Sequence, residues 1–258
     1  VLPLSRDLVT IKTDCVLDVS LDGLECKKPD IKMLKKIYAE LELNQFLKQL
    51  NYESISFKSS KFLDGSNPID PDYSLVTTLE DLDQWISRCK SSRIFSLDTE
   101  TTSIVSRYAS LVGVSLSDAV GRACYIPIGH RDGEQIESAI VLQKLSELLT
   151  DRNLICVAHN WKYDLTVLEM VGLTPQCMLA DTMLMSYVLD AAGSRHDMNT
   201  LAKKHLNLLT VAYEDVCGKG VKQIGFDEVK IDAALHYAAE DADVTLRLYN
   251  LFSAELGA

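Results

Sequence analysis

The fold is decided by the stretch Arg93-Ile94-Phe95-Ser96-Leu97-Asp98-Thr99-Glu100, an apolar run that ends in two acids. Side chains alternate across a β-strand, so Asp98 and Glu100 project from the same face. Two carboxylates on a buried strand are costly unless a positive charge lies between them. A solvated strand end at a loop is the alternative. The stretch predicts a strand over 93–98.

A second apolar strand, over 154–158, leads into His159-Asn160-Trp161-Lys162-Tyr163-Asp164. Asn160 is a typical helix N-cap residue, which places Asp164 in the first turn of a helix over 161–171. An acid at that position can simply complement the helix dipole. Taken alone, this segment therefore predicts a strand followed by a helix and demands no functional role for its acid.

The last helix, expected over 231–252, carries an acid on its apolar side. One stripe of this helix consists of Tyr237, Asp241, Val244, Leu248 and Leu251, at spacings of four and three residues. Glu240 and Asp243 lie elsewhere on the helix and are expected to be solvated. A carboxylate on a core-facing stripe is uncommon unless it is paired or binds a metal. A buried salt bridge is the alternative for Asp241.

The rest of this region alternates between strands and helices. The other expected helices cover 79–89, 136–149, 182–190 and 198–206, and the other expected strands cover 109–116, 123–128 and 177–180. Short links between the first three strands indicate an antiparallel run, whereas later strands alternate with helices as parallel crossovers do. The predicted fold class is α/β, a mixed β-sheet flanked by helices.

Residues 1–70 are predicted to form a small N-terminal appendage. They are expected to contain a short irregular or extended piece and then one helix over 31–50, where apolar residues form a stripe. The strongest break signal in the chain is Asp64-Gly65-Ser66-Asn67-Pro68-Ile69-Asp70-Pro71. We therefore predict a linker there, followed by one domain over 71–258.

Composition narrows the possible partners. The 258 residues include 26 Lys or Arg and 37 Asp or Glu, a net charge of −11, which argues against the basic surface that binds duplex nucleic acid. No apolar run approaches the ~20 residues of a membrane-spanning helix. The 7 cysteines form no Cys-x-x-Cys pair, which argues against a zinc ribbon and suits a reducing compartment. We expect a cytoplasmic monomer with no membrane partner.

The acids of the three segments are expected to meet. Strand ends and helix starts converge at one edge of a sheet in α/β folds, which brings together Asp98, Glu100, Asp164 and Asp241. Carboxylates this close cannot all stay ionised unaided. Ligands that offer only oxygen suit Mg²⁺ or Mn²⁺ better than zinc. The four acids therefore predict a site for divalent cations.

These segments resemble the motifs of the DEDD superfamily of 3′–5′ exonucleases, in its tyrosine-bearing branch. The matches are Asp98-Thr99-Glu100 to Asp-x-Glu, Asn160-Trp161-Lys162-Tyr163-Asp164 to Asn-x-x-x-Asp, and Tyr237-Ala238-Ala239-Glu240-Asp241 to Tyr-x-x-x-Asp. Within this superfamily, the sequence most resembles the proofreading domain of the family-A polymerases, to which bacterial DNA polymerase I belongs. Further similar segments are Ala180-Asp181-Thr182-Met183-Leu184, Arg195-His196-Asp197-Met198 and, resembling the tail of a 5′-nuclease region, Leu8-Val9-Thr10-Ile11-Lys12-Thr13-Asp14. The resemblance implies a ribonuclease H-like exonuclease fold.

The resemblance also implies a reaction. Two ions of Mg²⁺ or Mn²⁺ would support hydrolysis of phosphodiester bonds from the 3′ end of single-stranded or frayed DNA, releasing nucleoside 5′-monophosphates. By resemblance, Asp98 bridges both ions, Glu100 and Asp241 complete the tighter site, and Asp164 holds the second ion through water. Tyr237 would orient the attacking water, because a phenol with a pKa near ~10 is a poor base at neutral pH.

Five further residues are expected to contact substrate. The resemblance implies that Ile104 wedges beside the terminal base, that Tyr213 packs near the terminal nucleotides and that Arg195 contacts a backbone phosphate. Thr99 and Asn160 complete the set. Ordinary alternatives exist for three of them: Ile104 in the core, Tyr213 as a packing residue in a loop, and Arg195 as a surface charge.

Two other functions stay open. An RNA-trimming exonuclease like ribonuclease D shares the motifs, although the 5′-nuclease-like tail argues against it. A non-catalytic scaffold between nuclease and polymerase modules is the other, although the intact acids argue against it. The leading hypothesis implies two partners, the single-stranded 3′ end of DNA and a polymerase domain in the parent chain. Nothing in this chain resembles that domain, so DNA synthesis cannot be assigned to it.

Overall fold

The computed structural model describes residues 2–12, 29–41, 43, 71–191 and 195–257. The chain divides into two compact units, Val1–Asp64 and Gly65–Ala258. The predicted boundary between residues 70 and 71 falls near this division, and the predicted break itself lies almost wholly outside the described residues. The assignment of residues 1–70 to a 5′-nuclease-like tail and linker stays a prediction.

The first unit contains two described helices, α1 (Leu2–Val9) and α2 (Ile31–Glu40). The expected irregular or extended start is therefore wrong for the first residues, which are helical. The helix expected over 31–50 begins as predicted, where Asp30 Oδ1 accepts hydrogen bonds from the backbone N–H groups of Lys32 and Met33, at 3.0 Å each. It ends at Glu40, and most of the expected remainder lies outside the described residues.

A mixed sheet forms the centre of the second unit, with the strand order β1-β4-β3-β2-β5-β6 in the described part of the chain. Its strands are β1 (Asp72–Leu75), β2 (Ile94–Thr101), β3 (Leu111–Ala119), β4 (Arg122–Pro127), β5 (Ile155–Ala158) and β6 (Met178–Asp181). β3 runs antiparallel to β2 and β4, and the other neighbouring pairs are parallel. The predicted mixed sheet and its antiparallel run are confirmed. The short β1 was not predicted.

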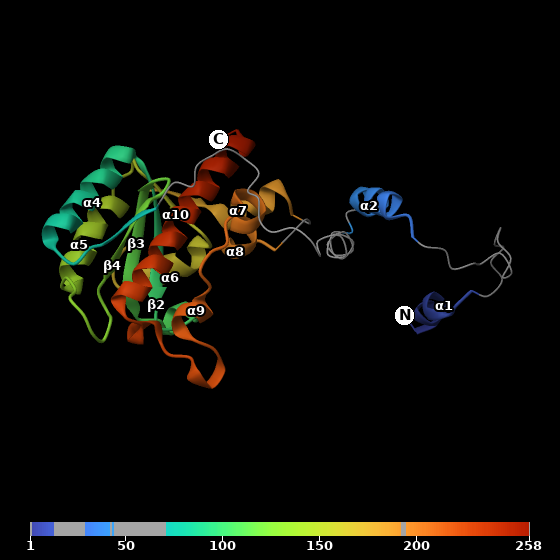
Figure 1. The fold of residues 1–258 in the computed structure, drawn as a ribbon, viewed down its shortest axis with the longest axis horizontal. Helices are drawn as coiled ribbons and strands as arrows, with labels where there is room; N and C mark the ends of the chain where they lie inside the picture. The colour runs from blue at the N-terminus through green and yellow to red at the C-terminus, as the bar shows by residue number, and fades with distance from the viewer. Residues whose placement is uncertain (1, 13–28, 42, 44–70, 192–194, 258) are drawn as a thin grey trace. The chain divides into compact units, whose positions relative to one another are not determined.

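Helices cover both faces of this sheet (Figure 1). They are α4 (Leu79–Ser92), α5 (Ser138–Leu149), α6 (Trp161–Met170), α7 (Thr182–Leu189), α8 (Met198–Leu201), α9 (Tyr213–Cys217) and α10 (Ile231–Leu256), with 3₁₀ turns η2 (Ser106–Tyr108), η4 (Gly220–Lys222) and η5 (Phe226–Glu228). The helix expected over 198–206 is divided, because α8 continues as a π-helical turn, η3 (Ala202–Leu206). None of the described helices is long and apolar enough to cross a bilayer.

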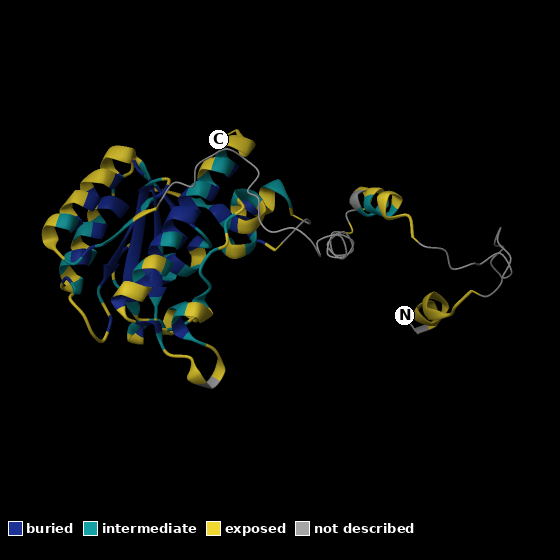
Figure 2. Ribbon diagram, in the orientation of Figure 1, coloured by how far each residue is buried: buried dark blue, intermediate teal, exposed yellow. Residues whose placement is uncertain are grey.

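One face of the sheet packs on α4, α5 and α6. Phe95 and Leu97 of β2 are fully buried there, in one cluster with Trp85 of α4, Leu145 of α5 and Leu168 of α6. Figure 2 shows the strands as a buried layer between helices whose outer sides are exposed. Because side chains alternate along β2, its even-numbered residues, including Asp98 and Glu100, face the opposite layer.

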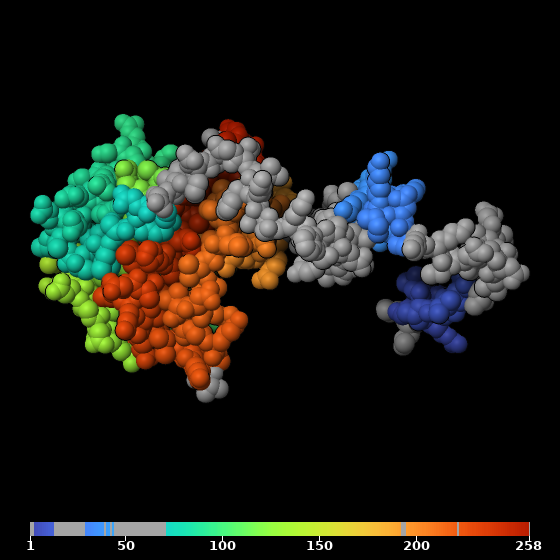
Figure 3. Space-filling view, viewed as in Figure 1, coloured from blue at the N-terminus to red at the C-terminus, as the bar shows by residue number. Residues whose placement is uncertain are grey.

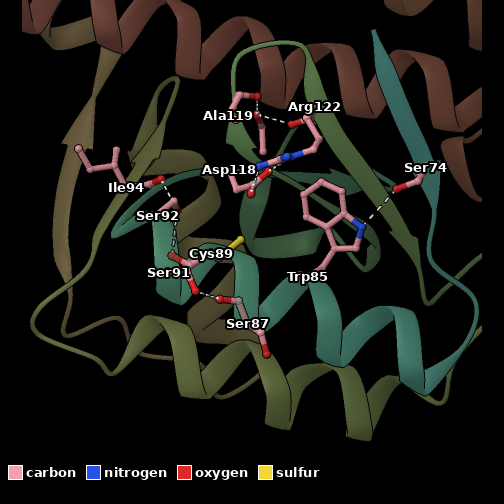
Figure 4. Close-up of polar contacts among 11 residues, drawn as sticks. Ser74, Trp85, Ser87, Cys89, Ser91, Ser92, Ile94, Asp118, Ala119 and Arg122 are labelled. Atoms are coloured by element: carbon pink, nitrogen blue, oxygen red, sulfur yellow. Dashed lines mark hydrogen bonds and ion pairs between the residues drawn. The ribbon is translucent and has the colours of Figure 1, made fainter.

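Polar contacts surround the C-terminal end of α4 (Figure 4). The hydroxyl of Ser92 donates to the carbonyl oxygen of Cys89 at 3.0 Å, an acceptor that the helix end leaves free, and to that of Ile94 at the start of β2, at 2.8 Å. Across the β3–β4 turn, Arg122 donates to both oxygens of Asp118, at 2.8 and 2.6 Å. Both sets of contacts are local, one between the end of α4 and the start of β2 and the other within the β3–β4 hairpin.

The opposite face packs on α10 through small residues. Ser96, Ala123, Ala239 and Ala242, here called the small-residue seam, are all fully buried. The hydroxyl of Ser96 donates to the carbonyl oxygen of Ala242 at 2.6 Å, so helix and sheet come close together. This close packing carries the middle of α10 over β2.

Asp243, which was expected to be solvated, is 1% exposed. Its Oδ1 accepts from the backbone N–H of Gly121 at 2.7 Å, and its Oδ2 accepts from the hydroxyl of Tyr73 at 2.9 Å. Arg247 donates to both oxygens, at 3.0 and 2.9 Å. The expectation is wrong because Tyr73 comes from β1 and Gly121 from the β3–β4 turn, partners that a helical stripe does not reveal.

Candidate active site

Three carboxylates meet where β2 ends. One oxygen each of Asp98, Glu100 and Asp241 lies within 4.8 Å of the other two. Asp98 and Glu100 extend from the same face of β2, and Asp241 reaches them from α10 across the small-residue seam. The register between β2 and β3 shifts between Glu100 and Thr101, an irregularity that often accompanies active sites. The structure thus brings together three of the four predicted acids in one group.

Asp164 lies beside this group. It is in the first turn of α6, as expected, and it is 3% exposed. Its Oδ1 accepts hydrogen bonds from the backbone N–H of Thr99 at 3.1 Å and from the Thr99 hydroxyl at 2.6 Å. Thr99 was predicted to contact substrate, and here its hydroxyl holds the carboxylate that approaches from the other layer of the fold.

The pKa values of all four acids are raised, chiefly because the carboxylates are buried. Burial is the largest cause, and it raises the pKa of Asp98 well above its usual value together with repulsion from Asp164, Glu100 and Asp241. Burial, Asp241 and Asp164 likewise raise the pKa of Glu100. Burial raises the pKa of Asp164 and of Asp241 to about 7, although hydrogen bonds from Thr99 and Tyr237 respectively oppose the rise. Such a group is poorly compensated without a cation.

The donors present fit a divalent cation. Glu100 Oε1 is buried and has no hydrogen-bond partner, an arrangement that native proteins seldom leave without a reason. None of the ion pairs recorded among the described residues involves Asp98, Glu100, Asp164 or Asp241. Every donor is a carboxylate oxygen, the ligand type that Mg²⁺ and Mn²⁺ prefer.

Tyr237 lies one helical turn before Asp241 and hydrogen-bonds with its carboxylate. Burial and the neighbouring acids raise the pKa of the phenol, so Tyr237 keeps its proton at neutral pH. Tyr213 and Phe226 surround it, with ring centroids 6.3 and 5.8 Å away. Tyr213 begins α9, and Figure 3 shows this orange segment against the red α10.

The remaining predicted substrate contacts lie around the acids. Ile104 follows β2 and is 93% exposed, so it is not a core residue. Asn160 occupies the predicted N-cap position of α6, in the left-handed region at φ 70°, but its side chain makes no capping hydrogen bond. Arg195 is exposed, with its Nε 3.2 Å from Asp197 Oδ2. Their contacts with nucleic acid stay predictions.

Sequence reasoning gave no role to Tyr163 or Asp181. The Tyr163 hydroxyl lies 2.5 Å from Thr101 Oγ1 and also bonds the carbonyl of Ser103, which ties α6 to the loop after β2. Asp181 accepts hydrogen bonds from the first residues of two helices. Both residues lie within segments noted for their resemblance, but a motif does not identify partners that are distant in sequence.

Comparison with known proteins identifies the family. A family model described as 3′–5′ exonuclease matches residues 73–257. DNA polymerase I of Pseudomonas aeruginosa is 40% identical over 261 residues, covering 99% of this chain and 28% of that protein. The chain therefore spans less than a third of the length of that relative.

Two solved structures share the fold. NrnC of Brucella melitensis with bound Mg²⁺ matches with a TM-score of 0.52 and 22% identity, over 72% of this chain and 81% of that one. Ribonuclease D of Trypanosoma brucei in complex with RNA U12 matches with a TM-score of 0.58 and 18% identity, over 70% and 63%. At such identities the likeness shows the ribonuclease H-like exonuclease fold alone. The family model, however, spans the elements that carry all the clustered acids, from β2 to α10, and the chain accordingly belongs to the 3′–5′ exonuclease family.

Proposed function

We propose that this chain is the proofreading part of a DNA polymerase I and removes nucleotides from the 3′ end of single-stranded or frayed DNA. The observation that carries the proposal is the group of three close carboxylates with an unpartnered Glu100 oxygen, in a chain 40% identical to a DNA polymerase I. The products are nucleoside 5′-monophosphates. The partner of this activity is the polymerase domain of the parent chain, in the cytoplasm.

Two ions of Mg²⁺ or Mn²⁺ complete the proposed site. Asp98 would hold both, Glu100 and Asp241 would complete one position, and Asp164 would hold the other through water. When bound, such ions neutralise charge on the phosphate and lower the pKa of water. The all-oxygen donor set supports this choice, as does the bound Mg²⁺ in NrnC, which has the same fold.

Tyr237 is proposed to orient the attacking water. Because burial and Asp241 raise its pKa, the phenol is a hydrogen-bond donor at neutral pH and not a base. Its ring is fixed by Phe226 and Tyr213, and Asp241 fixes its hydroxyl. The single proton of the phenol is directed at Asp241, so its oxygen would accept a hydrogen bond from the water, and a fixed acceptor of this kind lowers the entropic part of the barrier by holding the nucleophile in line with the phosphate.

A short single strand suits the surface around the acids. The proposed contacts are Ile104 beside the terminal base, Tyr213 near the terminal nucleotides, Arg195 at a phosphate, and Thr99 and Asn160 at the acids. Ile104 is almost fully exposed on the loop after β2, which supports a wedge. Stacking and apolar contacts of this type tolerate any base. A site for a few nucleotides needs no broad basic surface, which is consistent with the net charge of −11.

The test compares matched 5′-labelled DNA and RNA oligonucleotides with Mg²⁺ or Mn²⁺, using the full 258-residue chain. Stepwise shortening of DNA from the 3′ end, with release of 5′-monophosphates, is expected. Asp98→Ala serves as the control, and it should remove the activity while leaving folding almost unchanged, because losing one acid relieves repulsion. Preference for RNA would favour the ribonuclease D-like reading, and intact DNA would favour the scaffold.

A further inference from the structure

Asp181, at the junction of β6 and α7, is a carboxylate that the proposed chemistry does not use. Its Oδ1 accepts hydrogen bonds from the backbone N–H groups of Asn160 at 3.1 Å, Met183 at 2.9 Å and Leu184 at 3.3 Å. Its Oδ2 accepts from the backbone N–H of Trp161 at 2.9 Å. One side chain therefore satisfies donors at the start of two helices.

The first N–H groups of a helix have no partner within the helix. For α7, Asp181 is the N-cap in the ordinary way. For α6, it takes the place of Asn160, whose own side chain does not cap and whose backbone adopts the left-handed conformation. Asp181 can reach α6 because β5 and β6 are parallel and Ala158 pairs with Asp181 at their ends.

The turn that Asp181 holds determines the position of Asp164. Asp164 lies in the first turn of α6, three residues after Trp161, so a shift of this helix start moves its carboxylate directly. Thr99 restrains the same carboxylate from β2. Ligating carboxylates depend on such supporting contacts, and sites built this way tolerate displacements of only about 0.5 Å.

Asp181 does not itself belong to the acid cluster. The group of close carboxylate oxygens contains Asp98, Glu100 and Asp241, and both oxygens of Asp181 are already bonded to backbone N–H groups. We propose that Asp181 is a positioning residue of the exonuclease reaction, which caps α6 from outside the helix and thereby aims Asp164 at the acid cluster. The inference rests on the proposed function for its kinetic consequences.

Asp181→Asn is the decisive variant, because an amide offers one acceptor oxygen and sets an N–H₂ group against a backbone donor. We expect kcat on a single-stranded DNA oligonucleotide to fall by about 10- to 100-fold, while KM stays within about threefold. Calorimetric titration with Mn²⁺ should show weaker binding by a similar factor as kcat. Asp181→Glu, which keeps both oxygens on a longer chain, should restore part of each loss.

Thr78→Ala is the matched control. Thr78 is the N-cap of α4 and accepts from the backbone N–H of Asp81 at 3.2 Å, on a helix that carries none of the clustered acids. This variant should lower Tm while kcat and Mn²⁺ affinity stay at the wild-type values. If Asp181→Asn behaves like Thr78→Ala, with a lower Tm and unchanged kcat and Mn²⁺ binding, Asp181 is a structural cap only.

The two proposals can fail separately. A wild-type chain that binds Mn²⁺ but leaves DNA intact contradicts the proposed function, and the Mn²⁺ titration still tests Asp181. In that case weaker binding by Asp181→Asn supports the positioning role, and equal binding overturns it. A wild-type chain that cleaves DNA, together with a fully active Asp181→Asn, overturns the inference and leaves the function intact.

Discussion

Asp241 and Asp243 are two buried aspartates on α10 with opposite surroundings. Asp243 accepts four hydrogen bonds, two of them from Arg247, and its charge is matched. Asp241 faces the carboxylates of Asp98 and Glu100, and burial raises its pKa to about 7. The helix therefore carries one carboxylate whose charge is compensated by groups of the protein and one whose charge is not.

This difference distinguishes a carboxylate with a structural role from one with a functional role, without the use of sequence motifs. A buried charge with a cation and N–H donors stabilises the packing it joins, whereas a buried charge among like charges opposes folding until a ligand compensates it. Burial alone does not distinguish the two, because Asp241 and Asp243 are 8% and 1% exposed. The groups that contact each carboxylate distinguish the two.

The largest expected effect comes from replacing Asp241, the uncompensated carboxylate of the two. Asp241→Asn removes a proposed cation ligand, and we expect exonuclease activity to fall by ~10³-fold, equivalent to about 4 kcal/mol of transition-state stabilisation. The free energy of unfolding without divalent ions should stay equal or increase, because one like charge is gone. Single-turnover cleavage and urea unfolding measure the two quantities. Retained activity would contradict the role of Asp241.

Asp243→Asn should do the reverse. It leaves Arg247, whose side chain is 20% exposed, without its charge partner, so we expect a loss of about 3 kcal/mol in the free energy of unfolding. Activity per folded molecule should stay near wild type at low temperature, since Asp243 lies outside the acid cluster. Urea unfolding and cleavage rates test this prediction. Unchanged stability would mean that the pair contributes little, as some exposed pairs do.

The pH dependence of stability sharpens the comparison further. Asp241 titrates near 7 in the folded chain and near ~4 when unfolded, so the folded state binds more protons between these values. The contribution of this group to the free energy of unfolding without divalent ions should therefore fall by about 3 kcal/mol as pH rises from about 4 to about 7. Urea unfolding in EDTA should show a smaller fall for Asp241→Asn. Equal pH dependence in the two proteins would contradict the shifted pKa.

Mg²⁺ or Mn²⁺ should reverse part of this loss at pH 8, because a ligand that binds only the folded state stabilises it by RT ln(1 + [L]/Kd). Asp243→Asn provides the reference, since it keeps the acid cluster intact. A metal-dependent rise in Tm is expected for that variant and for the wild type, and it should be reduced in Asp241→Asn.

The smallest expected effect concerns Thr99, whose hydroxyl bonds Asp164. Thr99→Val keeps the shape but removes this hydrogen bond to a carboxylate, worth about 1.5 kcal/mol. We expect roughly a tenfold lower kcat at neutral pH and a higher apparent pKa for the acid limb of the kcat profile, because the bond lowers the pKa of Asp164. An unshifted profile would limit Thr99 to a packing role.

Residue patterns were sufficient to predict most of the second unit. The period of two along β2 placed Asp98 and Glu100 on one face, and the stripe on α10 placed Asp241 and Tyr237 on the buried side. These are local properties, because a strand or helix fixes side-chain direction without knowledge of its neighbours. The alternation of strands and helices likewise predicted the mixed sheet.

Contacts between distant segments were not predictable in this way. The burial of Asp243 is not predictable from the helix alone, because its partners Tyr73 and Gly121 lie in a strand too short to recognise and in a hairpin turn. Asp181 caps a helix that begins 20 residues earlier. The helical start at α1 was missed because eight residues give little more than two turns of periodic signal.

The small-residue seam has a consequence for ion choice. The contact between Ser96 and Ala242 sets how far α10 stands from β2, and hence the span between a ligand on the helix and ligands on the strand. Mg²⁺ requires oxygen at 2.0–2.1 Å, roughly 0.3–0.5 Å shorter than Ca²⁺. At the proposed cation site, uncharged residues that touch no ion would therefore act as a spacer that selects ionic radius, and a re-engineered preference for a larger ion would begin with bulkier side chains at Ala239 and Ala242.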